Sequence, residues 1–401
     1  MTGPLQGVRV VELAVWFAGP AIGGILSDWG ADVIKIEPLM GDPLRGLSYI
    51  GEQQSLPSGF ELDNRGKRGI AVDLAHNSGR DIGYELVRSA DVFFSNIRYA
   101  GLSRLGFDYE SLRAINKRLI YAHVSGFGLD TPDADRPTFD VGAFWARSGF
   151  AALLKQEDGT PTIPRGAMGD HATGANMAGG IAAALYARER GLAEGQFLST
   201  SLTRTAAYQL GQDMNLAIRT GAKPTMTPRS AQKNPLMNPY KTAEGRWIWL
   251  LMLESDRFWT RFVNVIGQSE WGEDLRFVDS SRRATNCAEL TSLLDDVLSK
   301  KSLLEWATVF EANDIWWAPL QEIEDVLMDE SFVGSGGLID VPDGAGGTVQ
   351  MVASPIDFSE TNWAPQGPAP QLGAHTELIL SDELGYGWET IVALKDQGII
   401  L

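Results

Sequence analysis

The first forty residues alternate between strand-like and helix-like patterns, and this alternation constrains the fold more than any other feature of the chain. Residues 8–13 are rich in β-branched side chains and predict a strand. Residues 20–29 predict a helix, because Pro20 suits a first turn, apolar residues share one face and Gly30 suits the end. Residues 31–37 predict a second strand. A strand, a helix and a strand within about 30 residues predict a parallel βαβ unit.

The same alternation continues along the chain. Residues 69–74, 91–95 and 119–125 are strand-like, and residues 79–89 have the spacing of an amphipathic helix. This alternation predicts a doubly wound α/β domain. Residues 172–190 predict a further helix with many small side chains, which would let another element approach closely.

With 401 residues the chain is long enough for two domains. The composition changes near residues 220–240, which are loop-like and rich in Pro, Asn and Lys. We therefore predict a large domain over residues 1–220 and a small domain over residues 225–330. The small domain begins with a strand at 247–250 and continues mostly as amphipathic helix. Residues 335–401 form a C-terminal segment that we expect to return to the large domain.

Composition narrows the choice of partners. The chain has 34 basic and 51 acidic residues, a net charge of −17 at pH 7, which disfavours nucleic acid but leaves a small anionic ligand possible. One cysteine, Cys287, allows neither an intramolecular disulfide nor a cysteine-based metal cluster, and the four histidines lack metal-binding spacing. The N-terminal residues do not resemble a signal peptide, and no segment is long and apolar enough to span a membrane. We expect a cytoplasmic protein that binds neither a metal nor a membrane.

The first βαβ unit raises the question of a dinucleotide site, because its second strand ends in an acidic residue, Glu37. The turn at residues 18–24 lacks the Gly-x-Gly-x-x-Gly fingerprint, and Pro20 lies where backbone amides would be needed. The residues therefore favour a βαβ unit that binds no nucleotide, which α/β proteins use freely.

Asp170 lies in the most suggestive stretch of the sequence, residues 166–174. It follows Gly169 and opens the helix of small residues, so it suits an N-cap, which contributes on the order of 1 kcal/mol. The same setting suits a carboxylate nucleophile in a glycine-rich loop, with backbone amides near enough to stabilise an oxyanion. The two interpretations are compatible, and the local residues leave both open.

A set of short motifs extends over nearly the whole chain. They are residues 5–13, 18–20, 30–38, 41–43, 64–68, 90–93, 96–98, 125–128, 139–140 and 169–170. In their order and spacing they resemble the class III CoA-transferases, also called the CaiB/BaiF family. The resemblance implies an α/β fold with a Rossmann-like large domain and a smaller α+β domain. It also implies a homodimer whose two chains are interlocked like links.

The resemblance further implies an acyl-CoA:carboxylate CoA-transferase that works through a covalent aspartyl intermediate on Asp170. Coenzyme A is then a co-substrate, acyl-CoA and carboxylic acids are the substrates, and no cofactor is permanently bound. The arginines among the family's CoA-contacting positions suit phosphate groups. Those positions correspond here to Phe17, Ala18, Asn96, Ile97, Arg98, Arg104 and Arg136.

Departures from the family patterns narrow the activity. Residues 250–256 lack the glycine run of some oxalate-type transferases, which disfavours oxalate or formate. Glu254 corresponds to a functional glutamate of the related α-methylacyl-CoA racemases. Their His-Asp pair reads Phe139-Asp140 here, so one of the two bases needed for racemisation is missing. We therefore favour a transferase over a racemase or isomerase, and over a non-catalytic CoA-thioester-binding paralogue, because Asp170 is present in its glycine-rich setting.

Aromatic residues near the family's active-site segments suggest the chemistry of the acyl group. Trp16 and Trp145 both lie in such segments, and an apolar pocket fits a large hydrophobic acid better than a small diacid. Together with Phe139, Asp140 and Glu254 they make up the substrate pocket that we expect.

Overall fold

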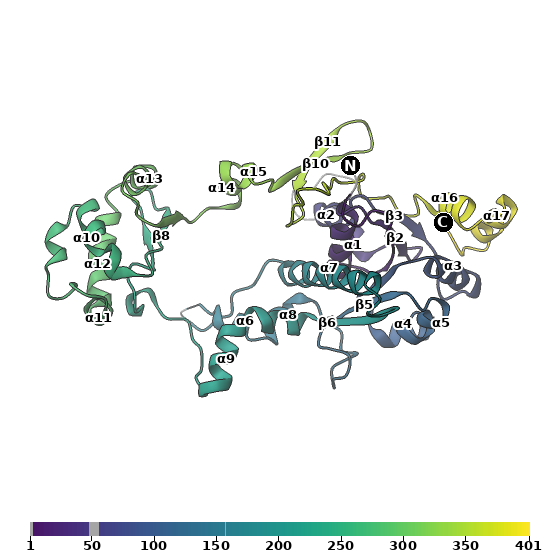
Figure 1. Cartoon of the computed structure of the whole chain (residues 1–401), viewed down its shortest axis with the longest axis horizontal. Helices are drawn as coiled ribbons and strands as arrows, with labels where there is room; N and C mark the ends of the chain where they lie inside the picture. The colour runs from purple at the N-terminus through teal and green to yellow at the C-terminus, as the bar shows by residue number, and fades with distance from the viewer. Residues whose placement is uncertain (1–2, 48–55, 157) are drawn as a thin grey trace. The chain divides into compact units, whose positions relative to one another are not determined.

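The computed structural model describes residues 3–47, 56–156 and 158–401. Contacts divide the chain into two compact units (Figure 1). The first unit comprises Met1–Pro224 and Ser335–Leu401, and the second comprises Thr225–Gly334. Each unit has hydrophobic clusters of its own.

A six-stranded parallel sheet forms the centre of the first unit (Figure 1). Its spatial order is β3-β2-β1-β4-β5-β6, and every neighbouring pair is parallel. The order reverses between β1 and β4, so the sheet is doubly wound, as the alternating pattern predicts. The strands are β1 (Arg9–Leu13), β2 (Asp32–Glu37), β3 (Arg68–Ala71), β4 (Val92–Ser95), β5 (Ile120–Ser125) and β6 (Gln196–Ser201).

Helices cover both faces of this sheet, as two neighbouring residues of β1 show. Successive side chains of a strand point to opposite faces, so Val10 joins the cluster that contains residues of α1 and α7, whereas Val11 joins the cluster that contains residues of α3 and α17. The helices and helical turns of the first unit are α1 (Ala18–Asp28), η1 (Pro43–Gly46), α2 (Ser58–Asn64), α3 (Asn77–Arg88), α4 (Tyr99–Leu105), α5 (Tyr109–Ile115), η2 (Val141–Ala146), α6 (Phe150–Leu153), α7 (Met168–Glu189), α8 (Leu202–Gln209), α9 (Gly211–Thr220), α16 (Thr376–Leu378), η5 (Ile379–Glu383) and α17 (Trp388–Asp396).

The small residues of α7 let α1 approach closely, as the sequence predicts. A Cβ atom on Gly174 would lie 2.8 Å from Cβ of Ala21 and 3.2 Å from the carbonyl oxygen of Ala18. The two helices therefore pack almost backbone to backbone, which brings the N-terminal end of α7 close to the N-terminal end of α1.

The C-terminal segment begins with an antiparallel hairpin of β10 (Leu338–Pro342) and β11 (Thr348–Val352) and then runs along β3. The His375 N–H donates to the carbonyl oxygen of Gly69, and the Ala71 N–H donates to Oγ1 of Thr376. The strand predicted at residues 69–74 is shorter than expected and ends at Ala71. The Val72 N–H still donates to the carbonyl oxygen of Glu37, but Val72 also bridges Ile400, and the Asp73 N–H donates to the carbonyl oxygen of Ile399.

The second unit contains a three-stranded antiparallel sheet of β7 (Pro239–Lys241), β8 (Trp247–Leu250) and β9 (Trp317–Pro319). The expected strand at 247–250 is confirmed as β8, and Trp259, Phe262 and Trp306 are prominent in the core. The helices are η3 (Arg229–Ala231), α10 (Ser255–Val265), η4 (Ser269–Gly272), α11 (Ser280–Thr285), α12 (Cys287–Leu298), α13 (Leu303–Ala312), α14 (Ile323–Leu327) and α15 (Glu330–Gly334). Across both units, none of the described helices has the length and apolar character to cross a membrane.

Candidate functional site

A cavity of about 330 Å³ opens at the carboxyl ends of β1, β4 and β5. Doubly wound sheets bind ligands at this point, where the strand order reverses. Its walls come from four segments, residues 15, 16 and 18, residues 96–98, residues 123–126, and residues 134 and 136–139. Leu202 adds to the wall, and Asp170 lines the cavity from the first turn of α7.

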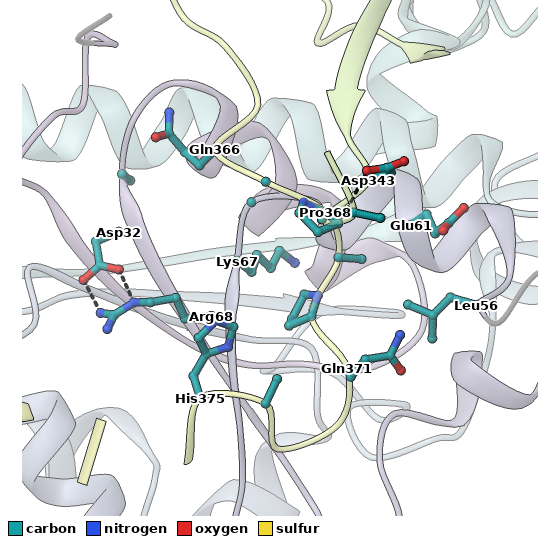
Figure 2. Close-up of a pocket in the computed structure, with 18 of the residues that line it drawn as sticks. Asp32, Leu56, Glu61, Lys67, Arg68, Asp343, Gln366, Pro368, Gln371 and His375 are labelled. Atoms are coloured by element: carbon teal, nitrogen blue, oxygen red, sulfur yellow. Dashed lines mark hydrogen bonds and ion pairs between the residues drawn. The ribbon is translucent and has the colours of Figure 1, made fainter. Parts of the chain in front are cut away.

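A larger cavity of about 810 Å³ lies between the β2–β3 region and the C-terminal segment (Figure 2). Two of the charged side chains that line it pair with each other: the Arg68 guanidinium donates to both carboxylate oxygens of Asp32, as Figure 2 shows. None of the described residues that line it belongs to the set expected from the sequence. We therefore place the candidate active site in the smaller cavity, where the partly buried carboxylate of Asp170 meets an apolar wall.

Asn96, which directly follows the neighbouring strand β4, holds the loop between β1 and α1. The Asn96 amide nitrogen donates to the carbonyl oxygen of Val15 at 2.7 Å, and the Val15 N–H donates to Oδ1 of Asn96 at 3.0 Å. Gly19, in the first turn of α1, packs against this loop, because a Cβ there would lie 2.4 Å from Cβ of Ala14. Asn96 thus shapes the cavity through the backbone of the first loop.

Two aromatic side chains form the apolar wall. Trp16 and Phe139 both line the cavity, and their rings meet edge to face with centroids 5.3 Å apart. Trp16 has a backbone φ of 63°, a left-handed conformation that is unusual for a bulky residue. Phe139 is 62% exposed, so its ring forms the outer part of this wall.

The N-cap interpretation of Asp170 is wrong. Helix α7 begins at Met168, and its N-cap is Ala167, which makes no side-chain cap hydrogen bond and has a φ of 70°. Asp170 therefore lies within the first turn, where the helix dipole favours an anion. The preceding Gly169 is required, because a Cβ there would lie 2.4 Å from the ring of Phe144.

The Asp170 carboxyl is strongly perturbed. Burial is the main cause that raises its pKa to about 7, the carboxylates of Asp140 and Asp63 raise it further, and His171 opposes them. No side chain in the described part of the chain donates a hydrogen bond to it. Asp140 sits beside it, accepts a hydrogen bond from the Gly169 N–H at 3.2 Å, and has its own pKa raised by burial. Near neutral pH, Asp170 is thus balanced between its acid and its anion.

Eight of the residues expected at the site line the cavity together. They are Trp16, Ala18, Asn96, Ile97, Arg98, Arg136, Phe139 and Asp170. Arg98 and Arg136 are both exposed, so their guanidinium groups are accessible to solvent. Arg136 also pairs with Asp133 at 3.3 Å.

The other expected residues are not among the described residues that line this cavity. Arg104 is exposed on α4, and Trp145 is buried in the core of the first unit. The Phe17 ring lies edge-on to the His171 ring, and the Asp140 carboxylate accepts a hydrogen bond from the Gly169 N–H. Glu254 belongs to the second unit, where it is exposed at the start of α10 and pairs with Arg257 at 3.1 Å.

Comparison with known proteins identifies the family. The family model described as CoA-transferase family III matches residues 5–376. The chain belongs to CoA-transferase family III. It is 31% identical to (R)-2-hydroxy-4-methylpentanoate CoA-transferase of Clostridioides difficile, over 99% of both chains. It is also 31% identical to cinnamoyl-CoA:phenyllactate CoA-transferase of Clostridium sporogenes, over 100% of this chain and 98% of that one.

A solved structure supports the same assignment. The crystal structure of a CaiB/BaiF family protein from Brucella suis superimposes with a TM-score of 0.84 and 30% identity. The match covers 95% of this chain and 100% of that chain. The mixed α/β fold with a central parallel sheet is therefore that of family III, and the expected membership in this family is confirmed.

Two residues that sequence analysis did not include lie beside the Asp170 of this family III protein. Nε2 of His171 is 3.2 Å from Oδ2 of Asp63, which is buried. Burial disfavours the charged imidazole, but the hydrogen bond to Asp63 and the neighbouring carboxylates raise the pKa of His171. The available signal was local: His171 directly follows Asp170, and Asp63 directly precedes the motif at residues 64–68.

The arrangement provides the elements of acyl transfer. A poorly solvated carboxylate can act as a nucleophile, an apolar wall is what a water-sensitive intermediate needs beside it, and the exposed arginines that line the cavity suit an anionic substrate. The described residues contain no group of three or more His, Cys, Asp or Glu side chains that could hold a metal ion.

Proposed function

We propose that this family III protein moves CoA from an acyl-CoA thioester to a free carboxylic acid, with Asp170 as the covalent nucleophile. The observation that carries the proposal is the Asp170 carboxylate, desolvated in the first turn of α7 and lining the cavity. Membership in CoA-transferase family III supports CoA thioesters as co-substrates. We propose no permanently bound cofactor.

The transfer proceeds in four steps. The Asp170 carboxylate attacks the thioester carbonyl carbon, the C–S bond breaks, and CoA leaves as a thiolate from a mixed anhydride. The thiolate attacks the aspartyl carbonyl, releases the donor carboxylate and forms an aspartyl-CoA thioester. The acceptor carboxylate attacks this thioester and gives a second anhydride and a free thiolate. The thiolate then attacks the acceptor carbonyl, which yields the new acyl-CoA and restores Asp170.

A carboxylate suits this chemistry because its anhydride keeps the acyl group activated, whereas an amine or hydroxyl would end in a stable amide or ester. The intermediates must be kept from water. The edge-to-face pair of Trp16 and Phe139 beside Asp170 supports this role. We assign Arg98 and Arg136, which line the same cavity, to the CoA phosphates, and Asn96, Ala18 and Ile97 to its other contacts.

We propose a hydrophobic acyl group. The cavity wall includes Trp16, Phe139 and Leu202, whose apolar surface suits a hydrophobic side chain better than the second carboxylate of a small diacid. Two relatives are named for acids with a branched aliphatic or an aromatic side chain, which supports the same class here.

We also propose the interlocked homodimer, with the first unit as the CoA-binding and catalytic part. Exposed apolar side chains on α8 and α9 support a second copy as partner: Tyr208 is 85% exposed and Ile218 is 80% exposed. Sedimentation at micromolar concentration should give twice the monomer mass, and a stable monomer would contradict the assembly. A cytoplasmic location stays a prediction from the sequence.

The test of the activity is CoA exchange between acyl-CoAs and free acids, followed by mass spectrometry. We expect Asp170→Asn to lose about 10³-fold or more of the exchange rate. Asp213→Asn is the matched control, since Asp213 also lies in the first turn of a helix, α9. Hydroxylamine added during turnover should convert Asp170 to a hydroxamate in the wild type only. Substantial exchange by Asp170→Asn would refute the assignment of the nucleophile.

A further inference from the structure

Backbone strain concentrates around the proposed active site. The described part of the chain has three non-glycine residues with positive φ: Trp16, Ala167 and Asp314. Trp16 lines the cavity, and Ala167 immediately precedes the helix that carries Asp170. A residue persists in such a conformation only where its surroundings hold it there. What holds Trp16 is therefore informative about the site.

The side chain of Asp42 holds the Trp16 backbone. Its Oδ1 accepts hydrogen bonds from the Trp16 N–H and from the Leu44 N–H, both at 3.0 Å. Its Oδ2 accepts from Nζ of Lys35 at 3.0 Å, and its own N–H donates to Oε1 of Glu37 at 2.9 Å. Asp42 is only 1% exposed. Hydrogen bonds to Leu44 and Lys35 thus fix both oxygens of the Asp42 carboxylate that accepts the Trp16 N–H.

Asp42 belongs to a fully buried ion network that holds the rest of the same loop. Lys35 also donates to Oε1 of Glu12 at 2.9 Å and to the carbonyl oxygen of Ala14 at 3.0 Å. Lys67 pairs with Glu12 at 2.7 Å and donates to the carbonyl oxygen of Pro20 at 2.9 Å. Removing charged groups from water costs free energy, which their mutual attraction does not always offset. We therefore look for a functional role of this network, which contacts the backbone on both sides of Trp16.

We propose that Asp42 is a positioning residue for acyl-group selection and acts through Trp16. By accepting the Trp16 N–H, it keeps the indole edge-on to Phe139 and so maintains the apolar wall that receives the side chain of a large hydrophobic acid. Asp42 itself does not line the cavity among the described residues. The inference rests on the proposed function, because it concerns which acids that reaction accepts.

A purely structural role is the competing explanation, since Asp42 also caps the helical turn η1 through Leu44. The two explanations differ in what they predict for substrates of different size. Loss of the cap lowers the amount of folded enzyme and affects all acids equally. Loss of the wall affects acids in proportion to the apolar surface that contacts it.

The experiment uses the full-length enzyme with acetyl-CoA as donor and two acceptors, isotopically labelled acetate and 3-phenylpropanoate. We expect Asp42→Ala and Trp16→Gly to lower the ratio of kcat/KM for 3-phenylpropanoate to kcat/KM for acetate by about tenfold or more, whatever loss the two acids share. Asp42→Asn should lie between them and the wild type, because an amide oxygen still accepts the backbone N–H of Trp16 while Lys35 loses one of its two carboxylate partners. Asp28→Asn is the control, since Asp28 is equally buried and pairs with Arg65 away from the cavity.

A double-mutant cycle tests whether Asp42 acts through Trp16. In the Trp16→Gly background, Asp42→Ala should leave the ratio of the two kcat/KM values unchanged; if Asp42→Ala does not fold, Asp42→Asn takes its place in the cycle. An equal loss for both acids, or a changed ratio in the Trp16→Gly background, would overturn the proposal. Absence of exchange with either acid in the wild type would instead refute the proposed function itself.

Discussion

The ionisation of Asp170 makes the most demanding prediction about the proposed transferase. Burial first, and then the neighbouring carboxylates, raise the pKa of Asp170 from the usual 3.8 to about 7. The anion, which is the nucleophile, then makes up about one tenth of the enzyme at pH 6 and about nine tenths at pH 8. We expect kcat/KM for the acyl-CoA donor to rise about tenfold between these pH values and to level off above them.

Two charge-removing substitutions should move this profile in opposite directions. Asp140→Asn removes a negative neighbour but keeps an oxygen to accept the Gly169 N–H, so the midpoint should fall by up to about one pH unit. His171→Gln removes the positive neighbour that Asp63 holds in place, so the midpoint should rise.

The assay is the initial rate of aspartyl-CoA formation at low donor concentration, from pH 5 to 9. Asp213→Asn, whose carboxylate lies in the first turn of α9, controls for the loss of one surface charge. A profile without change between pH 6 and pH 8 would refute the reasoning. A shift of the same sign in Asp140→Asn and His171→Gln would also refute it, since the two substitutions change the local charge in opposite senses.

Further substitutions test ionisation, packing and chemistry separately. Asp170→Asn should raise the free energy of unfolding at pH 8 by up to about 4 kcal/mol, because the folded state disfavours the ionised carboxyl that the unfolded chain leaves in water. The gain should disappear toward pH 4, where the carboxyl is protonated in the folded state and partly protonated in the unfolded chain; urea unfolding at both pH values measures this. Gly169→Ala should destabilise by about 1–3 kcal/mol through its clash with Phe144, measured in the same way. The enzyme should not exchange the α-proton of a 2-methylacyl-CoA in deuterated water, since Phe139 cannot titrate, and rapid uptake that is lost in Glu254→Gln would favour a racemase.

The sequence predicts the parallel sheet because its signals are local. Strands β1 to β5 overlap the predicted segments at 8–13, 31–37, 69–74, 91–95 and 119–125, and β8 of the second unit begins and ends at the predicted residues. Strand β6, with the sequence QFLSTS, has no continuous apolar run and is not among the predicted strands. The boundaries failed where tertiary contacts decide them. Beyond Ala71 the chain pairs with the C-terminal residues, where Val72 bridges Ile400 and the Asp73 N–H donates to Ile399, and no local pattern around residue 72 predicts those partners.

The start of α7 was mispredicted for a similar reason. Asp is a favoured N-cap and follows a glycine, so local propensity places the helix start at Asp170. The helix begins earlier, at Met168, because Ala167 takes a left-handed conformation and Gly169 packs against Phe144. Residues that are distant in the sequence, such as Trp16, Phe139 and Asp170, meet at one cavity, and only the order of the family motifs pointed to their association.

The strain and the buried charge around the cavity follow from what the proposed reaction needs. A well-solvated carboxylate is abundant as an anion at neutral pH but is a weak nucleophile, whereas a fully desolvated one is reactive but almost wholly protonated. A pKa of about 7 lies between these limits, where the product of anion fraction and nucleophilicity is greatest near neutral pH. Holding Asp170 there requires a dry wall on one side and fixed charges on the other. Trp16 supplies the wall at the cost of a left-handed backbone, and Asp140 and His171 supply charges of opposite sign. Relieving any one of these features should therefore stabilise the fold or simplify its ionisation while slowing the transfer.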